Sequence, residues 1–225
     1  MSDDVSQLAI PRRLIYFWHQ PSEIPDSILW AIEQTRLRHP DYEIVFGNDQ
    51  AICQFLKHRG LFELLFLYRN NQIPASRSDL ARLILLFAFG GIYLDAAMEI
   101  QGSFDNWIHP ANDLVLVRRD DLPRYQYGNS LPHVVNGLMA SKSKNALILA
   151  ALNQAILHLR SGQYNHDVWH ATGANCLNLH LSTYCQNYQI LYKNFSQLKD
   201  DFFVYRRDPT VSNVWRLQES RGIHR

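Results

Sequence analysis

Hydrophobic and polar positions form two alternating patterns along the chain. Short apolar runs rich in Ile, Val, Tyr and Phe predict strands, and longer stretches with helical spacing predict helices. The predicted strands cover 12–18, 42–46, 90–95, 113–117, 133–141, 189–193 and 202–205. The predicted helices cover 27–39, 49–57, 61–69, 75–89, 144–160 and 167–184, with Asp49 expected as a helix N-cap. Strands alternating with helices indicate an α/β fold.

The chain shows no internal repeat, low-complexity tract or linker composition, so residues 11–225 are expected to form a single domain. Residues 1–10 are expected to be a flexible tail. The longest apolar run, 83–94, is about a dozen residues long, well short of the roughly 20 that a membrane-spanning helix needs. We expect no membrane crossing, whereas peripheral contact with a membrane stays open.

The charge balance and the cysteine spacing argue against a nucleic-acid-binding protein and against a small disulfide-rich protein. Twenty-two basic residues meet 21 acidic ones, and no basic stripe indicates a nucleic-acid partner. The three cysteines form no CxxC motif or small disulfide framework, and the N-terminus has no apolar signal core. We therefore expect a cytoplasmic protein.

The stretch "SDLARLILLFAFGGIYLDAAMEI" (78–100) carries the strongest chemical signal. Asp79 and Arg82 stand three residues apart in a helix that is apolar around most of its circumference, so both charges need partners. Asp95 follows a short strand, and ligands of open α/β sheets bind beyond the carboxyl ends of strands. A carboxylate there can hold Mg²⁺ or Mn²⁺, or accept hydrogen bonds from sugar hydroxyls. A surface ion pair and a turn-capping aspartate are the structural alternatives.

This stretch resembles the sugar-binding region of the DXD-containing glycosyltransferases, a group that includes initiating α-1,6-mannosyltransferases and is related to clostridial glucosylating toxins. The family pattern is S-D-x-x-R, an apolar helix, then G-G-I-Y-x-D-x-D. The matching residues are Ser78, Asp79, Arg82, Gly90, Gly91, Ile92, Tyr93 and Asp95. Weaker similarities at 10–20, 39–49, 134–148 and 171–175 extend the resemblance over about residues 10 to 175, and "SNVW" (212–215) is a weak further match.

The resemblance implies a GT-A fold with a mixed, mostly parallel sheet flanked by helices. It also implies transfer of a hexose from a UDP- or GDP-sugar to a glycan or lipid-linked hydroxyl, with retention, in surface polysaccharide synthesis. By the same resemblance Asp95 and Arg82 are the catalytic residues, and Mn²⁺ or Mg²⁺ is held by Asp95 with Asn213. The implied donor-binding residues are Trp18, Asp79, Arg82, Gly91, Tyr93, Asp95, Asn136 and Trp215.

The sequence departs from the pattern at one position. Ala97 stands where the second aspartate of DXD would lie, and Glu99 is about 6.6 Å further along an extended strand. Three interpretations stay open. The chain resembles capsular polysaccharide transferases that have Ala at this position, and uses Asp95 with a C-terminal group; or it works with little or no metal and relies on Arg82; or it binds a nucleotide-sugar without turnover.

Some other residues are interpreted structurally. His166 and His170 have metal-ligand spacing but no evident third ligand, so a surface pair is favoured. Trp30, Trp107 and Trp169 are expected to pack, and "RRD" (206–208) is expected to face solvent.

Overall fold

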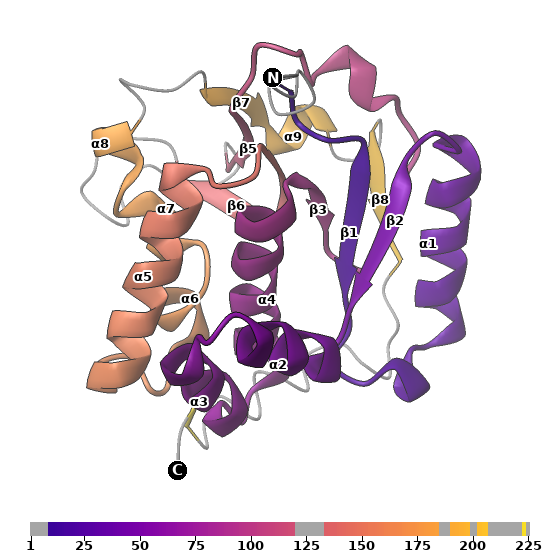
Figure 1. Ribbon diagram of the computed structural model, residues 1–225. Helices are drawn as coiled ribbons and strands as arrows, with labels where there is room; N and C mark the ends of the chain where they lie inside the picture. The colour runs from indigo at the N-terminus through magenta and orange to yellow at the C-terminus, as the bar shows by residue number, and fades with distance from the viewer. Residues whose placement is uncertain (1–8, 120–132, 185–189, 199–201, 207–221, 224–225) are drawn as a thin grey trace, which may run out of the picture.

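A six-stranded mixed sheet with strand order β2-β1-β3-β6-β5-β7 forms the centre of the computed structural model (Figure 1). The structure describes residues 9–119, 133–184, 190–198, 202–206 and 222–223. The strands of this sheet are β1 (Arg13–Phe17), β2 (Glu43–Gly47), β3 (Gly91–Leu94), β5 (Leu114–Arg118), β6 (Val134–Ser141) and β7 (Ile190–Asn194). β6 runs antiparallel to its neighbours β3 and β5, and the other pairs are parallel. The predicted mixed, mostly parallel sheet is confirmed.

The helices have the following bounds: α1 (Asp26–Arg38), α2 (Asp49–His58), α3 (Phe62–Asn70), α4 (Pro74–Phe89), α5 (Ala146–Ser161), α6 (Val168–Ala171), α7 (Asn175–Asn178), α8 (Leu181–Tyr184) and α9 (Phe195–Leu198). Short 3-10 helices cover Pro21–Glu23 and Phe104–Asn106. No helix in these described ranges is long and apolar enough to span a bilayer.

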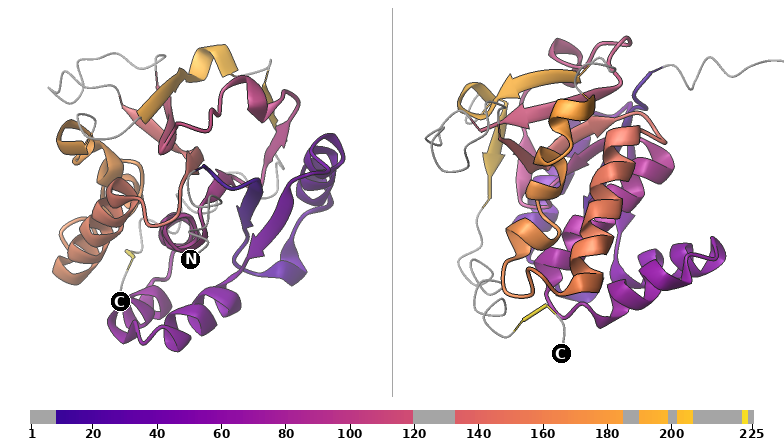
Figure 2. Two further views of the ribbon diagram at one scale, coloured as in Figure 1. Left: turned by 45° about the horizontal axis from the view of Figure 1, so that its top comes forward. Right: turned by 90° about the vertical axis from the view of Figure 1, so that its left-hand side faces the viewer.

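The sheet is buried on both faces. Alternate side chains such as Ile15 and Tyr93 join a core with α4 and α5, whereas Leu14 and Ile92 join a second core on the opposite face. Figures 1 and 2 show α4 and α5 against one side of the sheet and α1 on the other side of the molecule. Helices on both faces explain why the strands read as nearly continuous apolar runs.

Helix α4 carries the first part of the stretch 78–100, including Asp79 and Arg82. Pro74 starts it at a position where a missing N–H costs nothing, and Gly90 ends it with a φ of +64°. The next residue, Gly91, has a φ of +123°, and a Cβ on it would lie 2.7 Å from the carbonyl oxygen of Arg13 on β1. Both glycines therefore have a backbone reason: they turn the chain from α4 into β3 and bring β3 close to β1.

Several elements differ from the sequence-based predictions. Residues 167–184 form three short helices in place of one, with breaks at 172–174 and 179–180. At the first break a Cβ on Gly173 would lie 2.9 Å from Trp169. Asn48 caps α2, since its side chain accepts a hydrogen bond from the Ala51 amide, whereas Asp49 is the first helical residue.

A short two-stranded sheet, β4 (Met98–Ile100) with β8 (Phe203–Tyr205), was missed. Strand β8 had been predicted, but its antiparallel partner β4 had not. This small sheet packs against the face opposite α4, where Met98, Ile100 and Phe203 enter the second core. Helix α1 joins it there, because the Thr35 hydroxyl accepts a hydrogen bond of 2.9 Å from the Ile100 amide.

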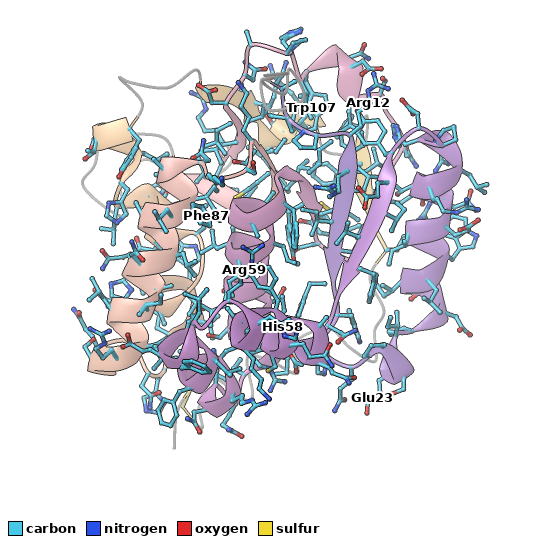
Figure 3. The ribbon with its side chains drawn as sticks, viewed as in Figure 1. Arg12, Glu23, His58, Arg59, Phe87 and Trp107 are labelled. Atoms are coloured by element: carbon cyan, nitrogen blue, oxygen red, sulfur yellow. The ribbon has the colours of Figure 1, made fainter. Side chains whose placement is uncertain are left out.

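The tryptophans separate into buried and exposed ones. Trp107 is buried as expected, whereas Trp30 is nearly half exposed, with the Arg206 guanidinium 4.9 Å from its ring centroid. Figure 3 shows Trp107 and Arg12 at the end of the molecule where β1 begins, and Phe87 on α4 on the side of α5.

Candidate functional site

Arg82 is the centre of a buried charged cluster at the carboxyl end of β3. Its Nη2 atom lies 3.1 Å from Oδ1 of Asp79 and 3.3 Å from Oδ1 of Asp95. Its Nη1 donates a hydrogen bond of 2.6 Å to the carbonyl oxygen of Asn136 on β6. The guanidinium also lies over the ring of Tyr93, 4.7 Å from the centroid. The structure thus brings together Asp79, Arg82, Asp95 and Asn136, four of the residues that the resemblance implies for donor binding.

Asp79 is almost fully buried and is held by three neighbours. Asn136 donates a hydrogen bond of 2.8 Å to its Oδ1, and the Thr172 hydroxyl lies 3.1 Å from its Oδ2. Burial raises the pKa of Asp79 to about 6, against the opposing effect of the Arg82 charge. Burial alone would lower the pKa of Arg82, but Tyr93, Asp95 and Asp79 together raise it, so the guanidinium stays charged.

Asp95 is the open member of the cluster, with a side chain that is 36% exposed. Its backbone amide donates to the carbonyl of Gly137 on β6, which places its side chain directly over that glycine. A Cβ on Gly137 would lie only 2.4 Å from Oδ2 of Asp95. Any side chain at position 137 would therefore displace this carboxylate.

Tyr93 and Gly91, both predicted to bind the nucleotide-sugar, are buried within the fold. The Tyr93 hydroxyl lies 3.1 Å from the Ser78 hydroxyl, and Ser78 Oγ in turn accepts a hydrogen bond from Arg82. Burial raises the pKa of Tyr93, so its hydroxyl stays protonated. In this structure Tyr93 and Ser78 support Arg82 from below, and Gly91 serves the approach of β3 to β1.

Tyr205, from the C-terminal strand β8, is a residue of this site that sequence reasoning missed. A Cβ on Gly137 would meet its hydroxyl at 3.4 Å, beside the contact with Asp95. Burial raises the pKa of Tyr205, and the negative charge of Asp95 adds to the effect. No sequence signal linked "FFVY" to residue 95, because the link depends on the pairing of β8 with β4.

Glu99, on β4, supports the pairing of β4 with β8 through contacts with two arginines. It is 1% exposed, accepts a hydrogen bond of 2.9 Å from Arg38 on α1, and accepts one of 2.6 Å from Nε of Arg206, next to Tyr205. Arg206 was expected to lie on a solvent-facing segment (206–208); its side chain is 38% exposed and also pairs with Glu99, whereas 207 and 208 lie outside the described residues. Glu99 is consequently a structural anion and is not available to replace the missing second aspartate.

A second polar group lies at the carboxyl ends of β1 and β2. The hydroxyl of Tyr68 donates a hydrogen bond of 2.7 Å to Oδ1 of Asp49. The other carboxylate oxygen of Asp49 forms an ion pair with Nε of Arg77 at 3.3 Å. Trp18 follows β1 directly and is half-buried, and its ring lies 5.9 Å from that of His19. Burial and the nearby Arg77 charge lower the pKa of His19. Trp18 thus stands where the resemblance expects an aromatic residue beside a nucleobase, but it is not part of the Arg82 cluster.

The described residues do not by themselves fit a divalent cation. No three His, Cys, Asp or Glu side chains in the described ranges are grouped closely enough to hold one. Asp95 offers a single carboxylate that already pairs with Arg82, the methyl group of Ala97 cannot coordinate, and Glu99 is engaged elsewhere. Asn213 and Trp215 lie outside the described residues, so their predicted roles stay predictions.

His170 is bonded through Nδ1 to Asp167, and Asp167 also caps α6. This contact agrees with the structural interpretation of the histidine pair. Cys53 and Cys176 are free thiols, and burial raises the pKa of Cys176.

The sequence is similar to those of known glycosyltransferases. Residues 25–113 match the family described as "Glycosyltransferase sugar-binding region containing DXD motif". Inositol phosphoceramide mannosyltransferase 3 of Schizosaccharomyces pombe is 25% identical over 182 residues, which cover 72% of this chain and 49% of that protein. The chain therefore spans about half the length of this curated relative.

Two solved structures share the fold. The PaToxG glycosyltransferase superposes with a TM-score of 0.56 at 16% identity, covering 80% of this chain and 72% of that one. The UDP-bound glycosyltransferase domain of the YGT toxin superposes with a TM-score of 0.53 at 10% identity, covering 87% and 83%. These likenesses confirm the predicted GT-A fold. The segment from residue 25 to residue 113 thus matches the sugar-binding region of DXD-containing glycosyltransferases and is carried here on a GT-A fold.

Proposed function

We propose that this chain transfers a hexose from a nucleotide-sugar to a hydroxyl of a glycan or lipid-linked acceptor, with retention at the anomeric carbon. The observation that carries the proposal is the buried Asp79–Arg82 pair joined to the partly open Asp95 at the end of β3. The cluster lies within the segment that matches the sugar-binding family, and related folds in glycosyltransferases support the same activity.

The charges of the cluster favour the sugar over the diphosphate. Two carboxylates share one guanidinium, so the cluster is net negative when Asp79 is ionised. Sugar hydroxyls donate hydrogen bonds to such a site, and the open oxygen of Asp95 is the acceptor that a ligand reaches. A fixed negative charge also stabilises the oxocarbenium-like transition state of glycosyl transfer. The leaving diphosphate needs positive charge from other groups.

Each member of the cluster then has a distinct task. Arg82 orients Asp95 through the ion pair between Nη2 and Oδ1, which are 3.3 Å apart. Asp79 and Asn136 fix Arg82 from behind. Trp18, at the end of β1, is proposed to flank the nucleobase, where stacking contributes about 1–3 kcal/mol.

The identity of sugar and acceptor is proposed from the relatives. The curated relative is named as a mannosyltransferase acting on inositol phosphoceramide, which favours mannose and a lipid-linked acceptor. A UDP-bound structure among the fold relatives supports a nucleotide-sugar as the source of the hexose. The surface-polysaccharide role and the cytoplasmic location stay predictions.

A second function is favoured by one observation. Ala97 removes the usual second carboxylate, and the remaining described residues do not complete a metal site. A protein that binds a nucleotide-sugar without turnover would tolerate this loss.

Thermal unfolding with a panel of UDP- and GDP-sugars, combined with release of free sugar, tests the proposal. A sugar nucleotide at 100 times its Kd stabilises the folded state by about 2.7 kcal/mol. We expect such a shift for at least one compound, together with turnover that Asp95→Asn lowers by about 10²–10³-fold. Asp113→Asn is the matched control, since Asp113 is also partly exposed and ion-paired, with Lys142. Binding without any turnover would favour the second function, and no shift with any compound would leave only the fold.

A further inference from the structure

Helix α3 exposes large apolar side chains on its outer face. Phe62 is 65% exposed, Phe66 is 67% exposed, and Leu61 just before the helix is 46% exposed. Phe62 and Phe66 are four residues apart and so lie on the same side of the helix. The inner face is filled separately by Leu64, Leu65, Leu67 and Tyr68, which are buried in the core beside α4. The outer phenylalanines therefore contribute little to folding.

Positive charge surrounds these apolar side chains. Lys57, His58 and Arg59 end α2, and Arg69 lies in the last turn of α3, all of them exposed. Every residue from 50 to 70 is described by the structure, and the only acid among them is Glu63. Glu63 is paired with Arg160 on α5, so it does not offset the other cations. Exposed basic residues thus lie before and after the exposed apolar side chains along the chain, and we call them the basic rim of this surface.

We propose that this surface, which we call the α2–α3 corner (Lys57, Arg59, Leu61, Phe62, Phe66 and Arg69), docks on a lipid bilayer that carries anionic headgroups. Aromatic and leucine side chains enter the boundary between headgroups and acyl chains, while nearby cations bind the negatively charged headgroups. A contiguous exposed apolar patch marks an interaction surface, and the basic rim selects an anionic membrane as the partner.

The position of the corner agrees with this partner. Figure 1 shows α2 and α3 at the end of the molecule toward which β1 and β2 run. Strand β3 is parallel to β1, so its carboxyl end, which Asp95 follows, points in the same direction. Both His58 and Arg59 are exposed, and Figure 3 shows His58 at α2 and Arg59 extending from the end of α2 in front of α4. A hollow of about 680 Å³ adjoins the corner between α3 and the end of α5, and Phe66, Leu67 and Leu159 line part of it. Docking would bring this end of the protein to the bilayer.

Flotation with lipid vesicles tests the inference without any sugar donor or acceptor, so its failure leaves the proposed function standing. The probes are phosphatidylcholine vesicles with and without phosphatidylglycerol. We expect binding to the anionic vesicles and weak binding to the neutral ones. Phe62→Ser/Phe66→Ser and Lys57→Glu/Arg59→Glu should each weaken binding at least about tenfold, because each basic residue contributes on the order of a factor of five.

Leu29→Ser/Leu37→Ser is the matched control, since it removes two exposed leucines from α1, away from the corner. It should bind vesicles like the unchanged protein, and all variants should keep its thermal stability. Equal binding to neutral and anionic vesicles, or an equal loss in the α1 control, would overturn the inference. Light scattering that shows a dimer, converted to a monomer by Phe62→Ser/Phe66→Ser, would overturn it in favour of a contact between two copies.

Discussion

Arg82 Nη2 lies 3.3 Å from Oδ1 of Asp95, although Arg82 comes from the middle of α4 and Asp95 from the turn after β3. The arginine is buried, and the aspartate is the more exposed partner. A fixed interior cation thus holds a carboxylate at the surface of the site. This relationship supplies a preorganised hydrogen-bond acceptor, which is what recognition of sugar hydroxyls requires.

Gly137→Ala should disturb Asp95 without disturbing the backbone, since the φ of Gly137 is not positive. The added methyl group would lie 2.4 Å from Oδ2 of Asp95, so the carboxylate must move. Overpacking of this kind costs about 1–3 kcal/mol, which urea unfolding measures. In an Asp95→Ala background the same substitution should cost much less, because the clashing atoms are gone. Equal costs in both backgrounds would contradict the contact.

Asp79 should make stability depend on pH in a particular direction. Its pKa is raised from 3.8 to about 6 in the folded protein, mainly by burial, so between these values the folded state keeps a proton that the unfolded chain has lost. The stabilising contribution is therefore complete below pH 4 and lost as the pH rises past 6. Its size is about 3 kcal/mol at most.

Urea unfolding of the unchanged protein and of Asp79→Asn across this pH range isolates the effect, because asparagine does not titrate. The stability of the unchanged protein relative to the variant should fall between pH 4 and pH 7. A difference that stays constant with pH would show that Asp79 is ionised throughout.

Ala97→Asp should create a metal-dependent site. It restores the second carboxylate of the motif two residues after Asp95, in a segment fixed by the hydrogen bond from the Arg206 amide to the Ala97 carbonyl. We expect Mn²⁺ to increase the thermal shift caused by a nucleotide-sugar in this variant and to have a smaller effect on the unchanged protein. Ala97→Asn, which adds no charge, is the control. If Mn²⁺ acts equally on all three proteins, residue 97 has no part in metal binding.

Glu99→Gln should loosen the small sheet that carries Tyr205. The substitution removes the charge that binds Arg38 and Arg206, and hydrogen bonds to charged groups contribute about 1.5–3 kcal/mol each. We expect a loss of stability of that order in urea unfolding. Glu33→Gln breaks the exposed pair with Arg36 and should change stability far less, because solvent screens exposed ion pairs. Similar values for the two variants would mean that the buried pairs stabilise nothing.

Local patterns in the chain predicted much of the fold. The apolar run into Gly90 and Gly91 specified helix, turn and strand, because glycine alone adopts the required φ values at low cost. The break at Thr172 was not predictable from local spacing. At this break the Thr172 hydroxyl contacts Ser76 and Asp79 on α4, almost a hundred residues away in the chain.

For the candidate site, the resemblance to a family motif was sufficient to name Asp79, Arg82, Asp95 and Asn136 as donor-binding candidates, since a motif is read from residue types and their separations along the chain. It was not sufficient to assign their contacts. In the folded structure Tyr93 is buried and contacts Ser78, and Glu99 pairs with two arginines. Tyr205 lies beside Asp95 near Gly137. Those outcomes depend on the pairing of β8 with β4 and of β3 with β6, and hydrogen bonds between strands join residues whose separation in sequence carries no local signal.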